Sequence, residues 1–177
     1  MKNFKYILTI LFFTLFSTTA FSQNNIAVLD VIKLLKESKA AISMKDQLNA
    51  VAKKYTDEDQ KKQKEIQKQE EELLRQKATL TPEAFSDRKN TFEKKVIEFN
   101  KDAQAKRKAL ATAEKDAVTQ IEDEVEKIVK AIIDSDKITA VFRKSAIILG
   151  DTSIDITEKV VEELNKKLSA VTVKVTP

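Results

Sequence analysis

The chain has 177 residues and a formal net charge of +4, and it contains no cysteine, no histidine and a single glycine. This composition excludes a disulfide framework, an imidazole base, a thiolate nucleophile and an ordinary zinc site, and one glycine cannot build a phosphate-binding loop. The sequence therefore predicts a protein that is not an enzyme and that holds no cofactor or metal.

Residues 1–22 have the layout of a secretory signal peptide. Lys2 and Lys5 precede an apolar run over residues 6–16, and small residues lead to Ala20-Phe21-Ser22. We expect cleavage before Gln23 and export of the mature chain in soluble form, because no cysteine follows to carry a lipid. The apolar run is too short for a membrane span, and a retained N-terminal anchor is the alternative.

The charge of the mature chain is uneven. Without residues 1–22, 30 basic and 28 acidic side chains leave a net charge of +2. Residues 43–108 hold 17 basic and 13 acidic side chains, whereas residues 109–177 have a net charge of −3. This distribution would draw anionic partners toward residues 43–108.

The mature chain begins with a strand-like run at residues 26–31, which is rich in β-branched residues. Residues 31–37 are apolar on most sides and fit a helix of one or two turns under a sheet. Residues 38–41 are expected to connect this helix to the next element. Residues 23–42 are thus assigned to a β-rich body.

Residues 43–133 are expected to form a long antiparallel helical hairpin with its tip near residues 81–84. Pro82 is the only helix breaker in this span, and Thr81 and Glu83 beside it are typical of a helix N-terminus. The 38 residues from 43 to 80 would make an arm of roughly 57 Å. Such an arm cannot fold into a compact globule.

The two predicted arms mirror each other. Positions at 3-4 spacing pair across the tip when their residue numbers add to 165, so that apolar residues oppose apolar residues and Asp59 opposes Lys106. The predicted pairs include Leu80 with Phe85, Leu73 with Phe92, Ile66 with Phe99, Tyr55 with Leu110 and Met44 with Ile121.

The outer part of the first arm is thinly apolar. Between residues 58 and 77, every residue except Ile66, Leu73 and Leu74 is charged or Gln. A solvated helix face explains this composition, which would also permit disorder. The mirrored seam argues against disorder, and we expect an arm that flexes and frays.

Residues 134–177 complete the body. A dense apolar stripe at residues 118–133 should be buried against it, and residues 138–142 and 146–149 are interpreted as a β-hairpin turning at residues 143–145. Residues 158–168 predict an amphipathic helix capped by Asp155 or Thr157, with residues 156, 160, 161, 164 and 168 on its apolar side. The β-prone tail from residue 171 is short and could be disordered.

Taken together, these features resemble the Skp/OmpH family of periplasmic chaperones. The resemblance covers the mature chain and rests on the strand at residues 26–31, on Ala146-Ile147-Ile148-Leu149, and above all on the helix start Asp155-Ile156-Thr157. It implies an α+β, mostly helical fold in the periplasm. Three copies would assemble as a homotrimer whose short strands build a central β-barrel, with three hairpins extending around a cavity.

The resemblance also implies a function. It is that of an ATP-independent holdase that binds unfolded outer-membrane proteins in the cavity and prevents their aggregation. Contact with anionic lipid or lipopolysaccharide through the basic arms stays open, because Lys106-Arg107-Lys108 is explained equally well by a solvated helix face. A structural or adaptor coiled coil between envelope components is the alternative function. Nucleic acid is not an expected partner, given export and a mature charge of only +2.

Two groups of residues are candidates for function. Clients would contact large apolar side chains along the outer arms, and the trimer would be held together by a sheet shared within the body. The predicted client contacts are Ile66, Leu73, Leu80, Phe85, Phe92 and Phe99, and the predicted trimer residues are Ile26, Val28, Ile147 and Leu149.

Overall fold

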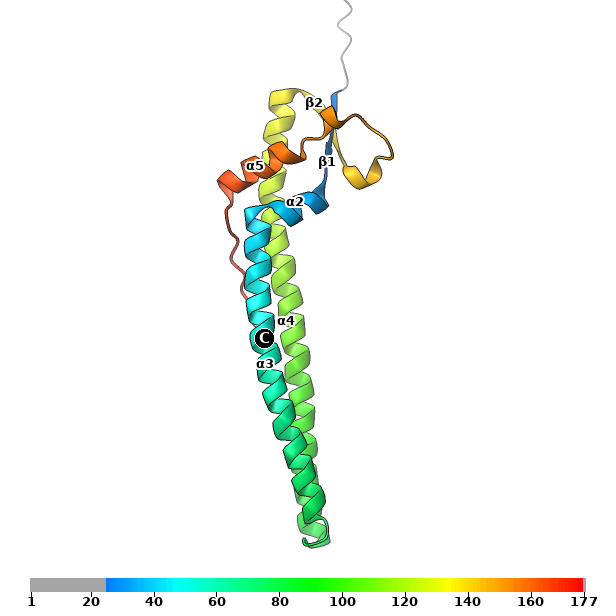
Figure 1. Ribbon diagram of the computed structural model, residues 1–177, viewed down its shortest axis with the longest axis vertical. Helices are drawn as coiled ribbons and strands as arrows, with labels where there is room; N and C mark the ends of the chain where they lie inside the picture. The colour runs from blue at the N-terminus through cyan, green and yellow to red at the C-terminus, as the bar shows by residue number, and fades with distance from the viewer. Residues whose placement is uncertain (1–24, 177) are drawn as a thin grey trace, which may run out of the picture.

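The computed structural model describes residues 25–176, so the predicted signal peptide and its cleavage site lie outside the described residues. Two long antiparallel helices project from a small body that contains the sheet and the shorter helices (Figure 1). The mostly helical α+β fold with a small sheet is thereby confirmed. In chain order the elements are β1 (Asn25–Leu29), α2 (Val31–Glu37), α3 (Lys39–Gln76), α4 (Pro82–Asp136), β2 (Ile138–Arg143), η1 (Lys144–Ala146), η2 (Thr152–Ile154) and α5 (Thr157–Lys167).

The first arm, α3, has the expected 38 residues but lies four residues closer to the N-terminus than predicted. Ser38 causes the shift. Its backbone N–H bonds to the Leu34 carbonyl and ends α2, while its Oγ accepts the N–H of Ala41 and caps α3. One buried serine therefore serves both helix ends, and the predicted connection at residues 38–41 does not exist.

The second arm, α4, runs for 55 residues. Thr81 Oγ1 accepts the N–H of Ala84 and Pro82 occupies the first helical position, as the sequence predicts. The helix ends where Lys137 adopts a left-handed conformation, with φ of 55°. This turn sends the chain directly into β2.

The predicted β-hairpin at residues 138–149 is wrong. β2 pairs in parallel with β1, and the whole helical hairpin lies between these two strands in the sequence. The 3₁₀ turn η1 then leads the chain away, and Ile156 donates its N–H to the Val28 carbonyl at 2.9 Å on the other edge of β1. Residues 147–149 form no strand, because η1 turns the chain away from the free edge of β2.

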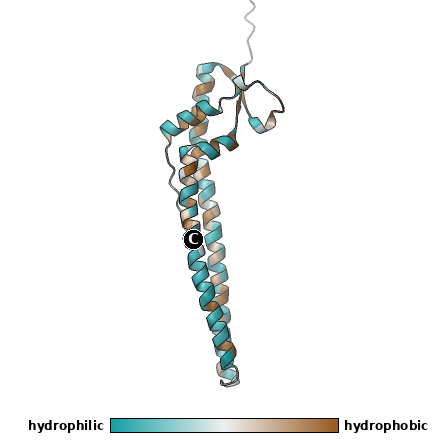
Figure 2. Cartoon of the chain, viewed as in Figure 1, coloured by the Kyte–Doolittle hydropathy of each residue, from teal (hydrophilic) through white to brown (hydrophobic). Residues whose placement is uncertain are grey.

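The core lies where α4 passes under the body. Ile121, Ile128 and Ile132 are almost fully buried there, which confirms that the dense apolar stripe of the second arm packs against the body. The predicted apolar face of α5 packs onto the same cluster through Val160, Val161 and Leu164. Figure 2 shows that apolar residues concentrate near the body, while the outer half of α3 is mainly hydrophilic.

The Asp155-Ile156-Thr157 segment ties the sheet to α5. Thr157 Oγ1 accepts the N–H of Asp30 at 2.8 Å, and Asp155 Oδ1 accepts the N–H of Thr157 at 2.9 Å. Burial alone would raise the pKa of Asp155, but hydrogen bonds from Lys144 and Thr157 lower this pKa to about 2. The motif therefore acts as a structural tether between β1 and α5.

Candidate functional site

The two arms meet in the predicted register at their middle. Lys106 Nζ lies 2.8 Å from Asp59 Oδ1, as the mirrored numbering requires. Toward the tip, polar bridges cross the arms between Lys62 and Asp102 at 2.7 Å and between Lys95 and Gln69 at 3.1 Å. These contacts keep the hairpin aligned where few apolar residues are available.

Lys106 is the most deeply buried charged side chain on the arms, with 5% of its surface exposed. Besides Asp59 it contacts Glu58 at 3.1 Å and Asp102 at 3.3 Å, and its ammonium group lies 5.2 Å from the centre of the Tyr55 ring. The hydrogen bond to Asp59 raises the pKa of Lys106 against the opposing effect of burial. Lys106 therefore belongs to the seam and is not available for an external lipid.

The six predicted client-contact residues share one property, which is partial exposure. None is fully buried and none is fully exposed, although they alternate with charged residues on both arms. They are Ile66, Leu73, Leu80, Phe85, Phe92 and Phe99.

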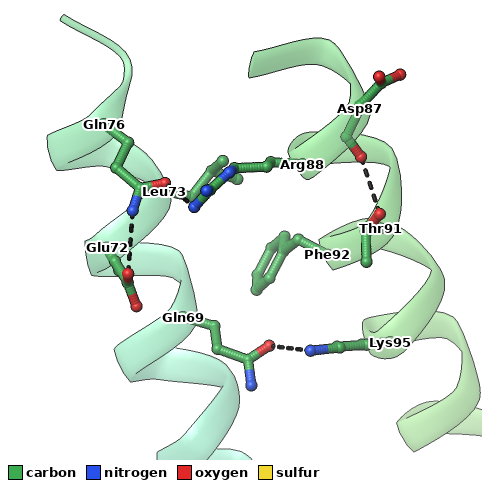
Figure 3. A pocket seen from close by; sticks show the side chains of 9 residues that line it. All are labelled: Gln69, Glu72, Leu73, Gln76, Asp87, Arg88, Thr91, Phe92 and Lys95. Carbon is green, nitrogen blue, oxygen red and sulfur yellow. Dashed lines mark hydrogen bonds between the residues drawn. The ribbon is translucent and has the colours of Figure 1, made fainter. Parts of the chain in front are cut away.

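Leu73 and Phe92 meet in a cleft of about 440 Å³ between the outer parts of the arms. Figure 3 shows the Phe92 ring pointing across the gap toward α3, between two polar bridges. One bridge joins Lys95 to Gln69, and the other joins Arg88 Nη1 to Gln76 Oε1 at 2.6 Å. The ring thus lies in a cleft that is open to solvent and framed by charged groups.

Phe99 lies further from the tip, in a separate cleft of about 420 Å³ with Tyr55, Leu110 and Lys106. The predicted contact between Ile66 and Phe99 stays a prediction. Two exposed apolar side chains on the outer parts of the arms, Leu74 and Ile97, were not among the predicted contacts. Their spacing gives no signal, because both lie outside the mirrored seam positions.

A third apolar cleft lies at the base of the arms and was also missed. It has a volume of about 780 Å³, and Leu35, Met44, Leu48 and Leu110 are among the residues that line it. Sequence patterning assigned Met44, Leu48 and Leu110 to the helix seam, which they only partly fill, and Leu35 to the short helix under the sheet.

The four predicted trimer residues do not form one sheet in the single chain. Val28 is buried in β1, Ile26 is 43% exposed on the same strand, Ile147 is half-buried, and Leu149 is 91% exposed. The expectation that residues 146–149 form a strand is corrected by the turn at η1. Ile148 and Leu149 instead project an apolar surface from the body.

The described residues show few features of other site types. Within residues 25–176, no group of three or more potential ligands is placed to bind a metal ion, and no helix is both long and apolar enough to cross a bilayer. The arrangement offers partly covered apolar surface on a charged, elongated frame.

Comparisons with known proteins agree with this architecture. A family model described as outer membrane protein (OmpH-like) matches residues 25–164. The crystal structure of a protein from Caulobacter crescentus CB15, assigned as an outer membrane chaperone (OmpH-like), has the same fold, with a TM-score of 0.80 and 16% sequence identity over 86% of this chain and 90% of that one. No curated protein shows significant sequence similarity. Because the family model spans most of the sequence, the chain belongs to the OmpH-like family.

Proposed function

We propose that the protein is an ATP-independent holdase that binds unfolded outer-membrane proteins between its helical arms and prevents their aggregation. Its family membership and the chaperone assignment of the structural relative support this function. We further propose that it acts in the periplasm as a homotrimer after removal of its signal peptide, with the arms of three chains around a shared cavity.

The observation that carries the proposal is the incomplete burial of large apolar side chains along the outer arms. Seam residues such as Leu73, Phe85 and Phe92 are half-covered, whereas Ile121, Ile128 and Ile132 of α4 are almost fully buried against the body. At about 25 cal/mol per Å² of apolar surface, each such residue can give a client roughly 0.5 to 1 kcal/mol. Many contacts of this size retain a chain by avidity and still release it without a motor.

The charge of the arms fits the same role. Residues 43–108 carry a net charge of +4 and lie almost entirely on the hairpin, so their field attracts anionic segments of an unfolded chain. Lysines cover the arm surface at many positions without forming a defined pocket. Such a surface favours capture of varied chains over recognition of one folded epitope.

The direct test is suppression of aggregation. A urea-unfolded outer-membrane β-barrel is diluted into buffer with the protein, and light scattering is followed with time. We expect Phe85→Ser combined with Phe92→Ser to weaken protection while helicity and oligomeric mass stay unchanged.

Phe85→Leu combined with Phe92→Leu is the matched control, because it keeps apolar surface at both positions and should keep most of the protection. Full protection by the folded serine variant would restrict both rings to a structural role. If the unchanged protein gives no protection and instead captures a single native envelope protein, the adaptor function replaces the holdase.

A further inference from the structure

The segment after α5 alternates in both sequence and burial. Residues 171–176 read Val-Thr-Val-Lys-Val-Thr, and the three valines are buried or half-buried while the residues between them are exposed. The segment runs beside α3 toward the tip (Figure 1), and Val171 belongs to the core with 5% exposure. The tail, whose order the sequence leaves open, is thus an extended segment with one covered face.

Gln47 of α3 holds the backbone of this tail. Its Nε2 donates to the Val171 carbonyl at 2.8 Å, and its Oε1 accepts the N–H of Val173 at 3.2 Å. In an extended chain these two groups point to the same side, and one residue of a parallel neighbouring strand would bond both of them. The side-chain amide, which carries a donor and an acceptor, therefore takes the place of a strand residue.

The opposite edge of the tail faces the second arm. The carbonyl of Thr172 points away from Gln47, and Gln120 Nε2 of α4 lies 3.5 Å from it, at the outer limit of a hydrogen bond. One glutamine from each arm thus contacts the tail backbone. Neither contact depends on the identity of a tail side chain, so the glutamines recognise extended backbone and the covered valines add apolar contact.

We propose that this groove is a binding site for extended client segments in which apolar and polar residues alternate, and that the tail occupies it until a client displaces it. The groove is defined by Gln47, Gln120 and the apolar surface under Val171 and Val173. This inference rests on the proposed holdase function and locates one client site.

The chemistry of the tail identifies the partner. Each membrane-spanning strand of an outer-membrane barrel alternates between lipid-facing apolar and lumen-facing residues, which is the pattern the groove holds here. The family match ends at residue 164, before the tail begins. Main-chain bonds with alternate side chains seated below them are the usual mode of strand recognition.

Attachment in the same chain makes the tail a selective competitor. A tethered segment has an effective concentration on the order of millimolar, so a short peptide added in solution competes poorly. An unfolded barrel offers many alternating segments, together with contacts along the arms, and can displace the tail. The groove would therefore open to long unfolded chains and stay closed to single short peptides.

The test uses the full chain with Val171→Ser and Val173→Ser, which removes the covered tail side chains. The probe is a fluorescent peptide that copies residues 170–177, and its binding is measured by anisotropy. We expect the tail-release variant to bind the probe about tenfold more tightly than the unchanged protein, because the competing tail is lost. Thr172→Ser with Lys174→Gln alters exposed positions only and should leave binding as in the unchanged protein.

Two further measurements test specificity. A peptide of the same composition with its three valines contiguous should bind the tail-release variant about tenfold more weakly, because it cannot seat valines at alternate positions. Adding Gln47→Ala to that variant should abolish the gain in binding. Equal binding of both peptides, or no gain in a folded tail-release variant, would overturn the proposed site.

A second experiment does not depend on the tail-release variant being stable. Thr172→Cys places the only thiol of the chain at an exposed tail position, where a fluorophore reports tail mobility. Addition of a urea-unfolded barrel should lower its anisotropy, whereas a silent label in the presence of bound client would overturn the inference. Aggregation is recorded in the same samples. A label that does not respond while aggregation is fully suppressed would refute the tail site and leave the holdase function standing. Failure of the unchanged protein to suppress aggregation would refute the holdase function itself.

Discussion

The ammonium group of Lys106 and the carboxylate of Asp59 lie 2.8 Å apart and divide the hairpin into two regions. Toward the body, Ala109, Ala113 and Ala117 are buried between the arms, whereas toward the tip the seam residues are only half-covered. The ion pair lies at this boundary and fixes the register of the outer arms, because a slip of one turn would separate the buried ammonium from the carboxylates of Glu58 and Asp59 on α3.

Replacing Lys106 with methionine should destabilise the outer hairpin. The change leaves Asp59, Glu58 and Asp102 close together with no buried cation to neutralise them. Since these carboxylates are partly solvated, we expect a loss of about 1 to 2 kcal/mol in the free energy of unfolding, below the value for a fully buried pair. Urea titration followed by circular dichroism measures the loss, and Lys108→Met at an exposed site is the control. Equal effects of the two substitutions would show that the cluster does not fix the register.

The register of the outer arms can be tested by crosslinking. Ile66→Cys combined with Phe99→Cys should form a disulfide readily on mild oxidation, because the predicted alignment brings these positions face to face. Ile66→Cys with Phe92→Cys is displaced by seven residues, about 10 Å along the helix, and should not crosslink. The two products are compared on non-reducing gels. Preferential crosslinking of the displaced pair would contradict the mirrored register.

Local signals explain what the sequence predicted well. Thr81 and Pro82 identify the start of α4 through short-range capping chemistry, and the polar pair of Asp59 with Lys106 pins a register that apolar residues alone leave loose. The OmpH-like family was recognised for a similar reason, since Asp155-Ile156-Thr157 performs several structural roles within three residues.

The predictions that failed depend on long-range pairing. Residues 147–149 have β-forming side chains, yet the 3₁₀ turn η1 directs them away from the outer edge of β2, which stays unpaired in the single chain. The sequence left the order of the tail open, because its ligand, Gln47, lies more than 120 positions earlier in the sequence. A lone glutamine on a helix gives no sign that it bonds a distant backbone.

The stability of the body should fall in acid through Asp155. The pKa of this carboxyl is depressed to about 2 from 3.8, so its contribution is fully present above about pH 4 and is lost as the pH falls through 2. The difference corresponds to about 2 kcal/mol. Urea unfolding between pH 5 and pH 2 should therefore show a steeper loss for the unchanged protein than for Asp155→Asn.

Because Asp136 and Asp151 also have lowered pKa values, the informative quantity is the difference between the two proteins and not the slope of either. Glu65→Gln, at an exposed arm position, is the control and should behave as the unchanged protein. If Asp155→Asn follows the same acid profile as the unchanged protein, the tether does not contribute to stability through its charge.

The last prediction concerns the interface of the proposed homotrimer. Ile148 and Leu149 are 95% and 91% exposed, and they adjoin a two-stranded sheet that is too small to be stable alone. Packing of these side chains and of the free edge of β2 against neighbouring chains would cover the exposed apolar surface and extend the small sheet. Leu149→Asp should therefore convert a trimer to a monomer without loss of helicity, as measured by light scattering after gel filtration. Ser145→Asp adds the same charge in the same loop and should leave the trimer intact.

Val28→Asp is a poorer probe than its place in the predicted sheet suggested, since Val28 is buried within its own chain and its loss would unfold the body as well. A Leu149→Asp protein that keeps the trimer mass would place the interface elsewhere on the body or on the arms.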